Sequence, residues 1–135
     1  MLKRIIKNQT DEIAYKINEE EISYSELYEK AIYYFETLSP YTYLKNENHG
    51  KEPNERDLRL IEELRIDMGL QPAVINVLLD YVLRVNNHKL TKSFVLTIAS
   101  QWQRLKIETA EDAMDQIFKE TKKKKTTTFV TKKEV

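Results

Sequence analysis

Glycine and proline are unusually scarce in this chain, whose 135 residues include two glycines and three prolines. An all-β fold needs many tight turns, and these two residue types supply the backbone angles of many of them. Their scarcity therefore disfavours a strand-rich fold and favours helices joined by short loops. Both glycines stand where helices would end, because Gly50 and Gly69 each follow a segment with helical spacing.

Helix-start signals recur along the chain. Ser23 and Glu26 form a capping box ahead of an apolar face that reaches Leu38. Similar capping residues precede the later segments, at Ser39, Asn54, Thr91 and Thr109. The signals predict helices within 10–20, 22–38, 39–50, 53–69, 72–85, 91–106 and 108–120. We therefore expect an all-α fold: a compact multi-helix bundle with short loops, an N-terminal helical extension and a flexible basic C-terminal tail.

The segment 72–85, PAVINVLLDYVLRV, is apolar almost all the way round. Its β-branched residues would suit a strand, but Pro72 at its start and its length favour a helix. A helix that is apolar on every side is buried. The segment is thus the predicted central helix.

The formal net charge is zero, but the charges are unevenly distributed. From Lys119 to the end there are seven lysines and two glutamates, so this segment carries +5 and the preceding 118 residues carry −5. Between Asp80 and Glu108 the sequence has five cations and no acid. Such a local excess of positive charge suggests an anionic partner.

Catalytic and metal-binding signals are weak. The chain has no cysteine and no GxxxxGK[ST] phosphate loop, and His49 and His88 lack a second ligand at helical spacing. No apolar run reaches the roughly 18 residues of a membrane span. We therefore expect no enzymatic activity, no catalytic residue, no cofactor and no bound metal.

Phe94, Ile98 and the only tryptophan, Trp102, follow one another at a spacing of four residues. Such a stripe is usually part of a core, but Trp is rarely fully buried. Aromatic rings beside cations are also what single-stranded nucleic acid requires, since bases stack on rings and cations follow phosphates. The sequence leaves both interpretations open.

The stripe resembles the YxxxIxxxW motif of the DnaD/DnaB domain family of Gram-positive replication-initiation proteins, with Phe94 in place of tyrosine. The flanking segments INVLLDYVL and KIETAEDAM agree, and the likeness spans roughly residues 39 to 120. Within the family, the chain is most similar to the second such domain of the helicase-loading members. The ring of the first motif residue is kept, and only its hydroxyl is lost.

The resemblance implies a non-enzymatic domain that binds single-stranded DNA and helps to load the replicative helicase in initiation and restart. The implied partners are DnaD, the helicase-loader ATPase and the replicative helicase, and the full-length protein would form homo-oligomers. The implied location is the cytoplasm, in association with the nucleoid, and any association with a membrane would be indirect. The residues expected to contact DNA are Phe94, Ile98 and Trp102, the cations Arg84, Lys89, Lys92, Arg104 and Lys106, and in the tail Lys122, Lys123, Lys124 and Lys125.

Three parts are expected along the chain: an N-terminal helical segment at 1–38, the DnaD/DnaB-like domain at 39–120 and the lysine-rich tail at 121–135. Residues 1–38 would be the end of a preceding domain or a self-association element, and the chain would then be a fragment of a longer protein. The alternative function is a protein–protein adaptor with no DNA binding of its own. The acidic body favours this alternative, because it would repel DNA over most of the surface.

Overall fold

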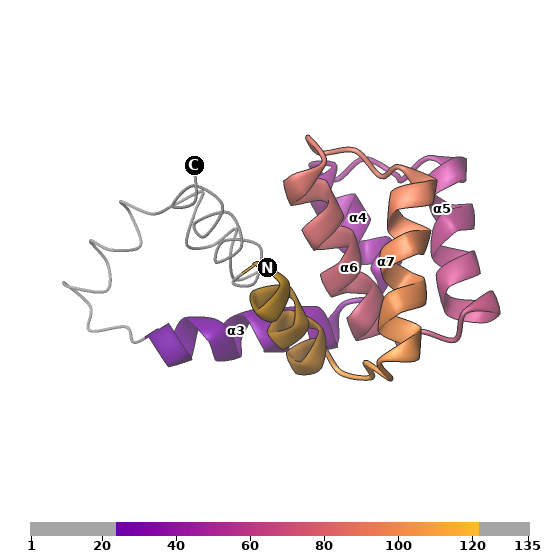
Figure 1. Ribbon diagram of the computed structural model, residues 1–135. Coiled ribbons are helices and arrows are strands. Elements are labelled where there is room, and N and C mark those ends of the chain that lie inside the picture. The colour runs from indigo at the N-terminus through magenta and orange to yellow at the C-terminus, as the bar shows by residue number, and fades with distance from the viewer. Residues whose placement is uncertain (1–23, 122–135) are drawn as a thin grey trace, which may run out of the picture.

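The computed structural model describes residues 24–121, and this range contains helices and loops but no strand. The helices are α3 (Tyr24–Thr37), α4 (Pro40–Glu47), α5 (Glu55–Glu62), α6 (Pro72–Val85), α7 (Lys92–Arg104) and a last helix at 110–121 (Figure 1). A π-helix, η1 (Glu63–Asp67), continues α5. The predicted all-helical fold is confirmed for this range. The helix expected at 10–20, the Ser23 cap and the lysine tail lie outside it.

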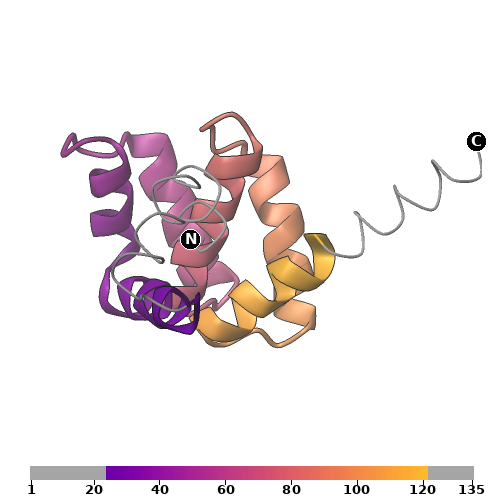
Figure 2. The same ribbon diagram turned by 90° about the vertical axis from the view of Figure 1, so that its left-hand side faces the viewer.

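The bundle has α4, α5, α6 and α7 standing side by side, while α3 lies across one end of them (Figure 1). The last helix runs from α3 towards α7, as the view turned by 90° also shows (Figure 2). Successive helices of the upright group run in opposite directions. The loops at 48–54 and 86–91 therefore lie at the same end, which we call the loop end.

Helix α6 occupies the centre, as its all-round apolar sequence predicted. Ten of its fourteen residues are buried, and it packs against α3, α4, α7 and η1. Since burial of one large aliphatic side chain stabilises a fold by roughly 1.5–3 kcal/mol, this helix supplies much of the stability of the core.

Helix α3 belongs to the same core as the upright helices. Its residue Phe35 is fully buried, and Ala31 is 3% exposed. The side chain of Asn76, on α6, donates hydrogen bonds to the carbonyls of Phe35 at 3.0 Å and Leu38 at 2.7 Å. These bonds satisfy carbonyls at the carboxyl end of α3, which have no partner within the helix. The boundary expected at residue 38 stays a prediction.

Candidate nucleic-acid interface

The buried face of α7 is formed by Val95, Ala99 and Trp102, which are at most 2% exposed. Phe94 and Ile98 are only partly buried and pack against the edge of the core. A spacing of four residues advances about 40° beyond a full turn at each step, so Trp102 lies roughly 80° round the helix from Phe94. The three residues of the motif therefore span a broad face, with Trp102 inside the core and Phe94 and Ile98 packed against it.

The burial of Trp102 corrects one expectation. At 2% exposure its indole cannot stack on a DNA base, so the direct contact with DNA expected of Trp102 is wrong. Trp102 acts as a core residue that fixes α7 in the bundle. A role in DNA binding for the partly exposed Phe94 and Ile98 stays a prediction.

Arg84 is a second correction, because its side chain lies inside the bundle and is 11% exposed. Its guanidinium lies 2.5 Å from Asp80 Oδ1 and 3.7 Å from Glu47 Oε1. The hydroxyl of Tyr43 donates to Asp80 Oδ1 at 2.5 Å and lies 3.1 Å from Glu47 Oε1. The guanidinium of Arg84 is already paired with both carboxylates, so Arg84 is not available to a phosphate.

The remaining cations lie at the two ends of α7. Lys89 and Lys92 are at the loop end, whereas Arg104 and Lys106 are at the carboxyl end of the helix. Thirteen helical residues separate the ends by about 18 Å. Lys92 Nζ lies 3.7 Å from Glu63 Oε2, while Lys89, Arg104 and Lys106 make no ion pair with any residue of the range 24–121.

The acid-free stretch of the sequence is thus not an acid-free surface. Helix α5 and η1 bring carboxylates to the amino end of α7, and Lys92 pairs with one of them. The count of charges between Asp80 and Glu108 includes only residues that are close in sequence. It misses the acids of α5, which lies about thirty residues earlier. The lysines Lys122, Lys123, Lys124 and Lys125 lie outside the described residues, and their role stays a prediction.

A groove of about 1040 Å³ opens between α5 and the loop at 86–91. Its loop end has cations and neutral donors, and its η1 end has several acids. The lining residues are Asn48, Asn54, Arg56, Asp57, Arg59, Leu60, Glu62, Glu63, Asp67, His88, Lys89, Leu90, Thr91 and Lys92. Arg56 was not among the expected site residues, because acidic neighbours surround it in the sequence.

Within residues 24–121, no group of three or more metal-ligating side chains could hold a metal ion. None of the helices in this range is long and apolar enough to cross a membrane. The pKa values of Tyr28 and Asp57 are clearly displaced from the ordinary values. Burial raises the pKa of the Asp57 carboxyl, and the nearby charge of Arg56 opposes the rise.

Comparison with known proteins identifies the class to which this helical domain belongs. The chain is a member of the family described as "Replication initiation and membrane attachment", whose pattern matches residues 41–117. The family resemblance predicted from the sequence is thereby confirmed.

A particular relative is the replicative helicase loading/DNA remodeling protein DnaB of Staphylococcus aureus (strain NCTC 8325 / PS 47). It is 37% identical over 62 residues, which cover 46% of this chain and 13% of that protein. The similar region is thus a small part of the relative. No solved structure matches the chain at a significant level.

Proposed function

We propose that this chain is a non-enzymatic, single-stranded DNA-binding and scaffold domain of a protein that helps to load the replicative helicase. Its proposed partners are single-stranded DNA, DnaD, the helicase-loader ATPase and the replicative helicase. The observation that carries the proposal is the set of exposed cations Lys89, Arg104 and Lys106 on α7 and its flanking loops, which make no ion pair with another residue of the range 24–121. Membership of a replication-initiation family and similarity to a helicase-loading protein support it.

The proposal does not need a stacked tryptophan. Lysine and arginine bind the phosphates of any sequence and release the condensed counterions, so affinity falls as salt rises. Phe94 and Ile98, which are partly exposed, would give the bases an apolar edge. Binding would therefore be mainly electrostatic and would show little sequence preference.

The test removes four cations together: Lys89→Gln, Lys92→Gln, Arg104→Gln and Lys106→Gln. We expect at least a tenfold loss of affinity for a labelled single strand, measured by anisotropy at several salt concentrations, with unchanged helicity. If all four cations contact phosphates, the slope of log affinity against log salt should fall by about 3. Unchanged affinity in a folded variant would contradict the proposal.

The lysine tail needs a separate test. A chain ending at residue 121 keeps the whole described domain and lacks Lys122–Lys125. If this shorter chain retains most of its affinity, the folded domain is the binding element. Loss of all affinity would assign DNA binding to the tail and leave the folded domain as an adaptor.

The adaptor function is favoured by an observation of its own on α3 and α4. The side chain of Tyr33 is 71% exposed, and those of Tyr34 and Tyr41 are 38% and 39% exposed. Exposed tyrosines are common in protein interfaces, where their rings provide contact area at a small entropic cost. Sedimentation of the wild type and of Tyr33→Ser over a range of concentrations tests whether this surface supports self-association.

A further inference from the structure

We infer that the DNA backbone is also bound at the loop end of the bundle, by Lys51 together with Arg56 and Lys89 of the groove. The inference rests on the proposed function and names further residues that contact the phosphates of the strand. Two of these residues, Lys51 and Arg56, belong to a part of the chain that the pattern of charges in the sequence did not point to.

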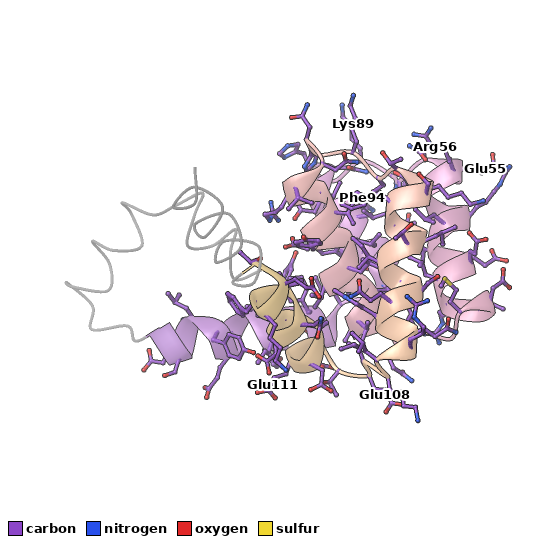
Figure 3. The ribbon with its side chains drawn as sticks, viewed as in Figure 1. Glu55, Arg56, Lys89, Phe94, Glu108 and Glu111 are labelled. Carbon is purple, nitrogen blue, oxygen red and sulfur yellow. The ribbon has the colours of Figure 1, made fainter. Side chains whose placement is uncertain are left out.

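Two loops that are far apart in the sequence meet at this site. Asn48, Asn54 and Arg56 line the groove from the first loop and the start of α5, and His88 and Lys89 line it from the second. Figure 3 shows Arg56 and Lys89 pointing outward from this same end, with Glu108 and Glu111 at the opposite end. The groove is as large as the largest pockets for small molecules, about 1,000 Å³.

The loop-end cations are available to a ligand. Lys51, Arg56 and Lys89 are exposed, and none of them forms an ion pair with a residue in the range 24–121. Their cationic neighbours are engaged, because Lys45 lies 3.3 Å from Glu52 and Arg59 pairs with Glu55. Three cations at the loop end thus make no ion pair within the range 24–121, although the charge of Asp57 lies near that of Arg56.

The carboxylates of the groove limit the path of a strand. Glu62, Glu63 and Asp67 line it towards η1, where they would repel phosphates. Asp57 is closer to the cations, and its charge interacts with that of Arg56. The favourable path therefore crosses the loop end from Lys51 and Arg56 to Lys89 and does not follow the groove towards η1.

The second loop holds Lys89 in place before any ligand arrives. The amide of Asn86 donates to the carbonyl of Lys89 and to the hydroxyl of Thr91, both at 2.9 Å. The backbone N–H of His88 donates to the carbonyl of Leu83 at 2.8 Å. A cation on an ordered backbone loses less entropy on binding than one on a loose segment.

The experiment compares two triple variants of the full chain that remove the same charge, one at the loop end and one on helices away from it. The first is Lys51→Gln, Arg56→Gln and Lys89→Gln. The control is Lys30→Gln, Arg65→Gln and Lys119→Gln, whose side chains are also exposed and make no ion pair with a residue in the range 24–121. Anisotropy of a labelled single strand at several salt concentrations gives the affinity and the salt slope of each.

We expect the loop-end variant to lose at least tenfold in affinity and about 2 in salt slope, and the control to lose less than threefold. Equal losses would mean that affinity follows net charge, and a larger loss in the control would place the additional contacts away from the loop end. Either result would overturn this inference while leaving DNA binding itself intact. A wild-type chain that binds no single strand would instead defeat the proposed function.

Discussion

At the scale of single residues, Arg84 shows how a charge changes its meaning when a chain folds. In the sequence it follows Asp80 by one turn and opens a stretch without acids. In the fold, α4 adds Glu47 and Tyr43, so that Arg84 joins a buried group with two carboxylates and a phenol. Buried charges of this kind are tolerated because each partner offsets the desolvation of the others.

The first prediction is that Arg84→Met destabilises the domain by about 3–5 kcal/mol, because Asp80 and Glu47 would then share a buried site without their cation. Denaturant unfolding measures the loss. Arg59→Met is the matched control: it also removes an arginine from an i,i+4 ion pair, but that pair is exposed, so it should change stability by less than about 1 kcal/mol. Similar losses in the two variants would show that the Arg84 group is not stabilising.

Trp102 shows that a sequence motif does not determine which of its side chains are buried. A spacing of four residues places three side chains on one side of a helix only approximately, because the directions of the first and the last differ by about 80°. The true buried stripe, Val95, Ala99 and Trp102, follows the spacing of three and four residues that a core requires. Both patterns are visible in the sequence, but only packing selects between them.

At the scale of elements, the helix ends were the most predictable feature because their signals are local. Asn54 caps α5 through its side chain, which accepts from the N–H of Asp57 at 2.8 Å, and Ser39 caps α4 in the same way. Gly50 and Gly69 have the left-handed backbone expected of them, with φ of 87° and 70°. What the local signals could not give is which helices become neighbours.

Three helices end in an unexpected way, with a residue other than glycine in the left-handed region. They are α4 at His49, α6 at Asn87 and α7 at Lys106. At the end of α7, the N–H of Ile107 donates to the carbonyl of Trp102 at 3.1 Å, and the N–H of Lys106 donates to that of Gln103 at 3.1 Å. This pair of bonds is the Schellman arrangement, in which glycine is the usual residue.

The second prediction follows from the φ of 57° at Lys106. Lys106→Gly should be more stable than Lys106→Ala by about 1 kcal/mol, because only alanine has a Cβ that opposes this backbone. Both variants lose the same charge, so the difference in their unfolding free energies reports the backbone alone. Equal stabilities would show that the end of α7 does not keep this conformation in solution.

The last helix at 110–121 is attached to α3 through polar contacts. The hydroxyl of Tyr28 donates to Asp115 Oδ1 at 2.6 Å, and the N–H of Ala110 donates to Glu36 Oε1 at 3.1 Å. Desolvation by burial, the bond to Asp115 and the negative charges of Glu111 and Asp112 all raise the pKa of Tyr28.

The third prediction concerns alkaline pH. Tyrosine in the unfolded chain loses its proton near pH 10, whereas the folded chain keeps the proton of Tyr28 to a higher pH. The stabilisation linked to Tyr28 is therefore complete below about pH 10 and is lost as the pH rises towards the folded pKa. Unfolding free energies of the wild type between pH 8 and 11 should fall more steeply than those of Tyr28→Phe, and parallel curves would contradict this assignment.

At the scale of the whole molecule, the fold brings together charged residues that are far apart in the sequence. Glu111, Asp112 and Asp115 lie near Tyr28 at the junction of α3 and the last helix, while Lys51, Arg56 and Lys89 at the loop end make no ion pair within the range 24–121. The sequence could predict a helical domain and, from its all-round apolar segment, a central α6. It could not place Arg56 beside Lys89, because that proximity depends on helices that turn back at the same end.

The final prediction tests how far the folded unit extends. A chain beginning at residue 39 would contain the whole family match, residues 41–117, but would lack α3. It would expose the surface of α6 that Phe35 covers and would remove the two carbonyls that Asn76 binds. Since a single large-to-small change such as Phe→Ala in a core costs about 3–5 kcal/mol, loss of the whole helix should abolish a sharp thermal transition.

Differential scanning calorimetry and binding of a hydrophobic dye measure this loss, and Tyr33→Ala in the full chain is the control. Because Tyr33 is 71% exposed, its replacement should change the unfolding free energy by less than about 0.5 kcal/mol. If the shorter chain melts as sharply and at the same temperature as the full one, residues 39–120 are a domain of their own. If it does not, α3 is part of the domain, and the cooperative unit begins before the region shared with the family.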